Sequence, residues 1–325
     1  MKHILFTHDD LDGAGCSVVF KLAHPDGEVI NCSNVNVDEK VNERADTFEG
    51  FDEIFFADIC CSKELLDDIH RSGFNLHVFD HHPTNAYAIE VLGEVYATVR
   101  STDENGVMVS GTSLLFDNLK SLIMNNDSHC MKEFITAVRE YDTYTFKQTG
   151  NMQAKYLQTL FGMLGLERFC KMYVEQLSSL IGCDMPLIDE TSMEFIMAKI
   201  ENEQKVIDSY KLDDIKLFQL GDYVCGLVYS INANFSEFSN QFLTKYPEID
   251  IMVLPAFGKD SAVFQFRAVK DGIDIGKEIA VPMGGGGHPK AAGAPMSDEL
   301  KNKFYSSILE EMSRLTNIPL ITQEI

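Results

Sequence analysis

The stretch ILFTHDDLDG, residues 4–13, joins a short apolar run directly to a cluster of acids. A short apolar run is typical of a buried β-strand, and Asp12-Gly13 is typical of a turn or a helix start. The stretch therefore predicts a strand, a turn and a helix, which together form the first half of a βαβ unit.

The same alternation continues through the first 120 residues. Further apolar runs lie near 29–30, 54–57, 76–79 and 95–99, and candidate helices lie at 14–23, 38–48, 62–72 and 111–124. Buried runs that alternate with helices predict a parallel sheet covered by helices. We therefore expect the chain to begin with an α/β domain.

The pattern changes near residue 129. Helical periodicity dominates as far as 211, and strand-like runs then resume at 215–220, 223–231, 249–256 and 260–268, before a terminal helix near 298–314. Because 325 residues exceed one typical core, two domains are expected. We predict an N-terminal α/β domain over 1–186 with a helical part at 129–186, a linker helix over 187–212, and a smaller C-terminal α/β domain over 213–325.

The net charge of the chain limits the classes of molecule that it is expected to bind. The chain has 27 Lys and Arg against 50 Asp and Glu, a net charge of −23. This excludes an electropositive surface that coats long duplex nucleic acid. No run approaches the roughly 18 apolar residues of a membrane helix, and the eight cysteines include no C-x-x-C pair that would indicate a zinc ribbon. We expect a cytoplasmic protein that does not contact a membrane.

Acids and histidines follow three of the predicted strands. They are His8, Asp10 and Asp12 after the first strand, Asp58 after the third, and Asp80, His81 and His82 after the fourth. In extended backbone the first three would project to one side, and the carboxyl ends of parallel strands meet at one edge of a sheet. Acids gathered there repel one another unless a cation is bound, and carboxylates mixed with imidazoles suit Mn²⁺, Mg²⁺ or Fe²⁺.

Taken singly, each cluster also fits ordinary turn chemistry, because Asp and His are common after strands. Three clusters in succession at equivalent strand ends favour a metal site instead. Asp142, in the segment REYD at 139–142, is weaker evidence, because an acid at a helix end is usually solvated.

The predicted C-terminal domain contains the run MGGGGHPKAAG, residues 283–293. Consecutive glycines let backbone N–H groups approach a phosphate closely, and we expect a following helix N-terminus to add a favourable dipole. The segment 257–293 has five Lys or Arg and four acids, so its net charge is +1 and the remainder carries −24. An anionic substrate is expected to bind in this domain.

Together the motifs resemble those of the DHH phosphoesterase family. The resemblance rests on His-x-Asp-x-Asp-Gly at 8–13, Asp58, the triplet Asp80-His81-His82 and Asp142, with GGGGH at 284–288 similar to the appended DHHA1 domain. It runs from residue 3 to about 295 in the order of the family. Segments 8–16 and 139–144 look most like nanoRNase B type oligoribonucleases.

The resemblance implies a role for each motif residue. One metal would be held by His8, Asp10 and Asp58, and the second by Asp12, Asp58, His81 and Asp142, so that Asp58 bridges the two. Asp80 would lie at or behind the first metal, and His82 would face the substrate phosphate. The residues implied to grip substrate phosphate are Arg267, Gly285, Gly286, Gly287 and His288, with further contacts at a helix start that holds Asn234, Ser236 and Asn240.

The implied activity is a two-metal phosphodiesterase, with Mn²⁺ as its first candidate ion, that hydrolyses very short RNA oligonucleotides to mononucleotides. The resemblance also allows a homodimer. The alternatives are a phosphodiesterase of cyclic or linear dinucleotides (the cyclic di-AMP or pApA type), a pAp phosphatase, and a nucleotide sensor without catalysis. A long-strand exonuclease is disfavoured, because the chain has no Trp and its net charge would repel an extended polyanion.

Overall fold

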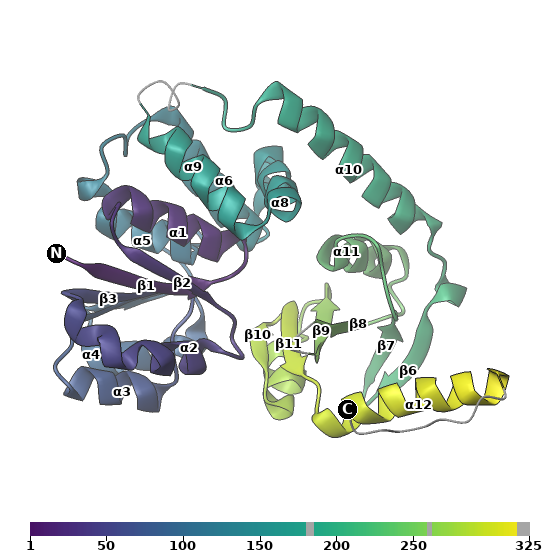
Figure 1. Cartoon of the computed structure of the whole chain (residues 1–325). Helices are drawn as coiled ribbons and strands as arrows, with labels where there is room; N and C mark the ends of the chain where they lie inside the picture. The colour runs from purple at the N-terminus through teal and green to yellow at the C-terminus, as the bar shows by residue number, and fades with distance from the viewer. Residues whose placement is uncertain (180–184, 259–261, 317–325) are drawn as a thin grey trace. The chain divides into compact units, whose positions relative to one another are not determined.

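A computed structural model describes residues 1–179, 185–258 and 262–316 (Figure 1). Cys183 and the first two residues of the strand expected at 260–268 lie outside the described residues. The chain divides into unit 1, Met1–Ile200, and unit 2, Glu201–Ile325. The predicted α/β class is confirmed, because unit 1 contains an all-parallel sheet and unit 2 contains a separate mixed sheet.

The sheet of unit 1 has the strand order β2-β1-β3-β4-β5, and all its pairs are parallel. The strands are β1 (His3–His8), β2 (Glu28–Cys32), β3 (Glu53–Ala57), β4 (Leu76–Asp80) and β5 (Ala97–Val99). The chain moves to one side of β1 for β2 and to the other side for β3. The switch point therefore lies between the carboxyl ends of β1 and β3, where open α/β sheets bind their ligands.

Helices cover both faces of this sheet. They are α1 (Leu11–Ala23), α2 (Val37–Arg44), α3 (Lys63–Arg71), α4 (Tyr87–Leu92), α5 (Gly111–Leu119), α6 (His129–Asp142), α7 (Phe146–Thr149), α8 (Met152–Leu164) and α9 (Leu166–Ser178). The predicted helices 38–48 and 111–124 are shorter than expected, because 3₁₀ turns at Ala45–Gly50 and Lys120–Leu122 end them.

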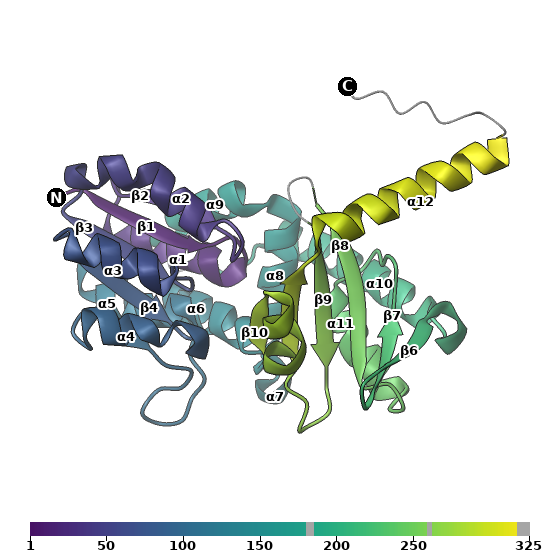
Figure 2. The ribbon, with the colours of Figure 1, turned by 90° about the horizontal axis from the view of Figure 1, so that it is seen from below.

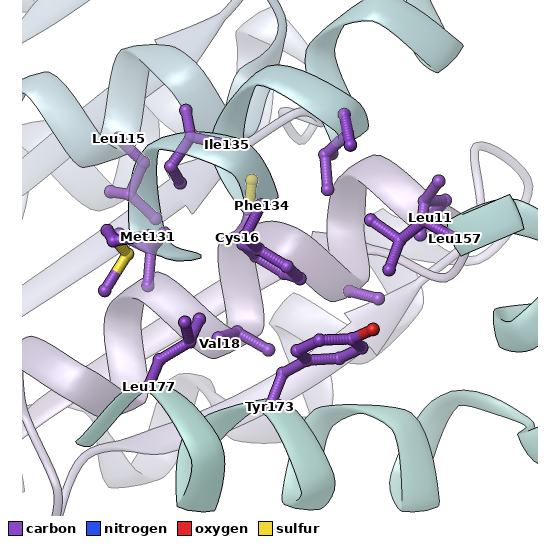
Figure 3. Close-up of a cluster of buried hydrophobic side chains, with 14 of the residues drawn as sticks. Leu11, Cys16, Val18, Leu115, Met131, Phe134, Ile135, Leu157, Tyr173 and Leu177 are labelled. Carbon is purple, nitrogen blue, oxygen red and sulfur yellow. The ribbon is translucent and has the colours of Figure 1, made fainter. Parts of the chain in front are cut away.

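Alternating strand residues supply two hydrophobic cores. Leu5 of β1 packs with α1, α5, α6, α8 and α9, whereas its neighbours Ile4 and Phe6 pack with α2, α3 and α4. Figure 3 shows the first core, where Phe134 and Tyr173 lie close to the α1 residue Cys16. Because both faces of the sheet are buried, the strand ends are where its side chains can reach a ligand.

The helix α10 (Glu190–Ser209) spans the boundary between the two units. Ile196 packs in a core of unit 1, and Ile207 packs in a core of unit 2. No helix in the described part of the chain is long and apolar enough to cross a membrane.

The sheet of unit 2 has the order β10-β11-β9-β8-β7-β6, in which only β7 and β8 are parallel. Its elements are β6 (Lys216–Leu220), β7 (Tyr223–Leu227), α11 (Phe235–Lys245), β8 (Ile251–Phe257), β9 (Ala262–Ala268), β10 (Gly286–His288), β11 (Ala291–Pro295) and α12 (Asp298–Thr316), with short helical turns at Gly276–Ala280 and Val281–Met283. The expectation of a helix directly after the glycine run is wrong, because β10 and β11 form a hairpin there.

Candidate active site

The turn between β1 and α1 places His8 beside Asp10. Asp10 caps α1, and its Oδ1 accepts a hydrogen bond from the Gly13 amide at 3.0 Å while its Oδ2 lies 2.8 Å from His8 Nδ1. A Cβ at Gly13 would lie 1.9 Å from the His8 carbonyl oxygen, so this turn requires glycine. The extended backbone that the sequence predicted continues as far as Asp10. Asp12, by contrast, lies in the first turn of α1.

Asp12 meets the start of α5. Its Oδ2 accepts a hydrogen bond from the Gly111 amide at 2.6 Å and its Oδ1 accepts one from the Thr112 amide at 3.0 Å. The Thr112 hydroxyl donates to the Asp12 carbonyl oxygen at 2.7 Å. A carboxylate at a helix N-terminus is stabilised by these N–H groups and by the helix dipole. Sequence reasoning missed both residues, because nothing local to them indicates a partner about a hundred positions earlier.

Asp58 follows β3 in a strained conformation. Its φ is 61°, in the left-handed region that non-glycine residues rarely adopt, and its side chain is buried. Gly111 packs so closely that a Cβ there would lie 2.4 Å from the Cβ of Asp58. Among the described residues, Asp58 Oδ2 has no hydrogen-bond partner. A buried carboxylate oxygen without a partner is costly, and a bound cation would satisfy it.

Asp80, at the end of β4, orients His82. The buried carboxylate accepts hydrogen bonds from the amide of His82 at 2.9 Å, from its Nδ1 at 2.7 Å and from Asn85 Nδ2 at 2.6 Å. Asp80 is thus held behind His82, and Asn85 is a further part of the site that the sequence did not reveal.

His81 points to the acids from the other elements. Its Nε2 lies 3.2 Å from Asp58 Oδ1, 3.4 Å from Asp142 Oδ2 and 3.9 Å from Asp12 Oδ2. Asp142 is the last residue of α6, so a helix adds its carboxylate to those from the strand ends.

The structure brings together the six residues that the resemblance implies as metal ligands and the two other residues of the DHH triplet, Asp80 and His82. Their possible ligand atoms form three groups, each within 4.8 Å: His8, Asp10 and Asp58; Asp12, His81 and Asp142; and Asp58, Asp80, His81 and His82. The groups lie at the switch point of the sheet, and Asp58 contributes to two of them.

The electrostatics of this cluster fit a divalent cation. Burial raises the pKa of Asp58 and of Asp142 well above the usual range, and the charges of Asp12 and Asp10 raise both further. The raised pKa values mean that the cluster cannot keep all of its carboxylates charged without a cation. Carboxylates and imidazoles gathered this closely could therefore hold metal ions.

The two half-buried histidines take up protons in this acidic setting. Burial alone would lower the pKa of His8, but the charge and hydrogen bond of Asp10 outweigh it and raise the value to about 9. His82 also has a pKa of about 9, because Asp80 outweighs the effect of burial. A metal that binds through His8 would have to displace a proton.

In unit 2, Arg267 and His288 lie in one row across the sheet. His288 of β10 pairs with Ala291 of β11, and Ala291 pairs with Arg267 of β9. Residues paired in this way point to the same face of a sheet, and two strand spacings separate them by about 10 Å. Ala291 has a small side chain, so it leaves space above the sheet between the side chains of Arg267 and His288.

The guanidinium of Arg267 is held in place by its neighbours. Its Nε donates to Ser236 Oγ at 2.9 Å, its Nη1 donates to the Phe266 carbonyl oxygen at 2.8 Å, and it lies 5.5 Å from the centre of the Phe235 ring. The start of α11 thus contributes Ser236 to the position of this arginine.

The other two polar residues assigned to this helix start differ in position. Asn234 caps α11, with its Oδ1 accepting from the Glu237 amide at 3.0 Å. Asn240, by contrast, lies inside α11 rather than at its start, and its carbonyl oxygen accepts a hydrogen bond from Thr244.

The glycine run is packed into the β10–β11 hairpin. A Cβ at Gly285 would lie 2.0 Å from the Gly293 carbonyl oxygen, and the Gly285 amide already donates to the Ala280 carbonyl oxygen at 2.8 Å. Gly287 has a φ of 135°, whereas a Cβ at Gly286 would meet nothing within 4 Å. Close packing thus explains Gly285 and Gly287, and Gly286 is the glycine of the three that neither packing nor a positive φ explains.

No protein-family model matches the chain. The chain is 28% identical over 309 residues to the oligoribonuclease NrnB of Bacillus subtilis (strain 168), a match that covers 93% of this chain and 75% of that protein. Among solved structures, the pGpG-specific phosphodiesterase PggH from Vibrio cholerae aligns with a TM-score of 0.51 and 14% identity over 96% of this chain and 99% of that chain.

These similarities confirm the predicted resemblance to the DHH/DHHA1 phosphoesterases. The match to PggH concerns the fold. The match in sequence to the oligoribonuclease NrnB agrees with the type of protein that the motifs resemble.

Proposed function

We propose that the protein is a metal-dependent phosphodiesterase that hydrolyses very short RNA oligonucleotides to mononucleotides. The observation that carries the proposal is the convergence of Asp and His side chains at the switch point of the parallel sheet, where Asp58 Oδ2 has no hydrogen-bond partner in the described part of the chain. The sequence similarity to an oligoribonuclease supports the substrate class.

In this proposal His8, Asp10 and Asp58 would hold one divalent ion. Asp12, Asp58, His81 and Asp142 would hold the second, so that Asp58 would be shared. Two ions held in this way would supply an activated water and stabilise the attacking and leaving oxygens of a phosphodiester. Mn²⁺ is the first candidate because the ligands mix carboxylates with imidazoles, and Mg²⁺ and Fe²⁺ are the alternatives.

His82 acts on the substrate phosphate. Its Nδ1 is bonded to Asp80, so its Nε2 is the nitrogen that can donate to a phosphate oxygen. Asp80 fixes the tautomer and orientation of the ring, and Asn85 in turn fixes Asp80. Asp80 is therefore a positioning residue for His82.

Unit 2 binds the phosphate of the substrate through Arg267, His288 and the amides of Gly286 and Gly287. The proposal assigns catalysis to residues 1–186 and substrate binding to 213–325, with 187–212 as the connection. The amide of Gly285 is left out, because it already donates to Ala280. Short substrates are favoured, because the acidic remainder of the chain repels additional phosphates.

The proposal also includes a cytoplasmic location and a homodimer. All seven cysteines in the described part of the chain are free thiols, which is usual in a reducing compartment.

The test is a product time course with Mn²⁺ on pApA, longer RNA, cyclic di-AMP, cyclic di-GMP and pAp. We expect mononucleotides from pApA at the highest rate, and no product when a chelator is in excess. Faster turnover of a cyclic dinucleotide or of pAp would support the corresponding alternative, and no turnover of any substrate would support a sensor. An Asp58→Ala protein purified in the same way controls for contaminating nucleases.

A further inference from the structure

The C-terminal helix α12 is unusual because none of its 19 residues is buried. Figure 2 shows it extending beyond the strands of unit 2. Phe304 of this helix stacks on Phe257 of β8, with ring centres 4.8 Å apart. A helix of this length is marginal in water unless tertiary packing covers its apolar face, so α12 lacks its usual source of stability.

The apolar residues of α12 lie along one side. Leu300, Phe304, Ile308 and Met312 recur every four residues, and Leu315 continues the row. Tyr305 and Leu309 widen it. We call these seven residues the α12 stripe. Each of them is between 42% and 67% exposed. Spacings of three and four place side chains on one helix face, which is the arrangement of helices that pack against another helix.

The charge of α12 limits what can cover this stripe. The helix has four acids and three bases, a net charge of −1, in a chain whose net charge is −23. A bilayer-binding helix needs an excess of Lys and Arg on its polar face, which α12 lacks. A basic partner would be drawn to the strongly acidic remainder of the chain. Two copies of this chain, by contrast, repel one another least where α12 is near neutral.

The area of the stripe is also suitable for a dimer. Seven large side chains at these exposures present roughly 700 Å² of mainly apolar surface, close to the roughly 800 Å² per partner of a standard interface. Such a patch is larger than most monomers leave open to water.

We propose that the α12 stripe is the interface of a homodimer, in which α12 packs antiparallel against α12 of a second copy. An isologous contact of this kind buries the same residues on both chains.

The proposal is tested by sedimentation velocity on the full chain over a range of concentrations. We expect the unmodified protein to be a dimer, and Ile308→Glu with Met312→Glu to raise the dimer dissociation constant at least about 100-fold. Ser306→Glu with Ser313→Glu is the matched control, because it adds the same charge on the polar side of the same helix. This control should remain a dimer, and both variants should keep the activity per chain.

A covalent measurement covers the case in which the double Glu variant does not fold. Ile308→Cys lies near the twofold axis of an antiparallel pair, so mild oxidation with diamide should link two chains through a disulfide, while Ser306→Cys should not.

Salt supplies a third criterion. Because two acidic chains repel one another, the dimer should become tighter as the salt concentration rises.

Several outcomes would overturn the proposal. These are an unmodified protein that is monomeric at tens of micromolar, a double Glu variant that remains dimeric, equal cross-linking of both cysteine variants, and binding of the monomer to phosphatidylcholine–phosphatidylserine vesicles. Truncation after Thr316 should leave the dimer intact. Loss of the dimer on truncation would assign the interface to residues 317–325 instead.

Discussion

The strand ends of unit 1 and the Arg267–His288 row of unit 2 hold polar groups in opposite ways. In unit 1, carboxylates that follow β1 and β3 and one at the end of α6 lie close to His81, and Asp58 Oδ2 has no hydrogen-bond partner among the described residues. In unit 2, Arg267 is held by neutral groups, and a small residue separates it from His288. The cluster of acids in unit 1 is unfavourable without a cation, whereas the Arg267–His288 row in unit 2 needs no added ion to hold its side chains in place.

The difference separates two kinds of consequence. A change among the acids of unit 1 alters the charge that holds a metal, so it should affect metal content and activity together. A change in the row of unit 2 should mainly affect substrate binding, because all six proposed metal ligands come from unit 1.

The largest effect is expected for Asp58→Ala. This change removes the carboxylate that both proposed metal groups share, so kcat/KM on pApA should fall at least about 1000-fold. The control is Asp26→Ala, which removes an exposed acid of the same type from the turn between α1 and β2. Steady-state kinetics with Mn²⁺ measure both variants. A normal rate for Asp58→Ala would mean that the cluster in unit 1 is not the metal centre.

A smaller effect is expected for Arg267→Ala and His288→Ala. Each removes a charge-assisted contact to phosphate, which should lower kcat/KM about 10- to 100-fold, mainly through KM, at unchanged metal content. Lys277→Ala, at an exposed base of the same unit, is the control and should stay near the normal value. Loss of metal from either variant would remove the contrast between the two regions.

Neighbouring glycines sharpen the description of unit 2. Gly285→Ala should lower the free energy of unfolding by about 1–3 kcal/mol, because its Cβ would overlap the Gly293 carbonyl oxygen. Gly286→Ala meets no atom and should leave stability unchanged. Urea unfolding compares the two. If Gly286→Ala lowers kcat/KM at normal stability, this glycine serves the substrate; equal stability of both variants would contradict the packing of the hairpin.

The smallest effect concerns substrate length. Because most of the chain is strongly acidic, kcat/KM should fall several-fold as RNA grows beyond about five nucleotides, and salt should reduce the difference by screening the repulsion. Rates on oligomers of two to ten nucleotides at low and moderate salt measure this. Equal rates on the dimer and on long single strands at low salt would show that charge does not limit length.

Most of the cluster in unit 1 could be predicted from the sequence, because its residues follow strands directly. His8, Asp10 and Asp58 needed only the rule that parallel strands end at one edge. The contact of Asp12 with the start of α5 and the contact of Asn85 with Asp80 could not be predicted in this way. Both depend on how segments distant in the sequence pack, and no local pattern encodes that.

The sequence was less informative about unit 2. A run of glycines looks the same whether it approaches a phosphate or fits a tight hairpin, and the packing of Gly285 against Gly293 appears only in the fold. The alignment of Arg267 with His288 depends on the register of three strands. The two are 21 positions apart in the sequence, so no local spacing indicated the alignment.

The central claim is that the acids of unit 1 hold two divalent ions that share Asp58. Its most direct test is the metal content of the purified chain, measured by mass spectrometry after loading with Mn²⁺ and desalting at moderate salt. We expect two ions per chain in the unmodified protein, in Asp26→Ala and in Arg267→Ala, and fewer than one in Asp58→Ala. Two ions retained by Asp58→Ala, or none bound by the unmodified protein, would contradict the account.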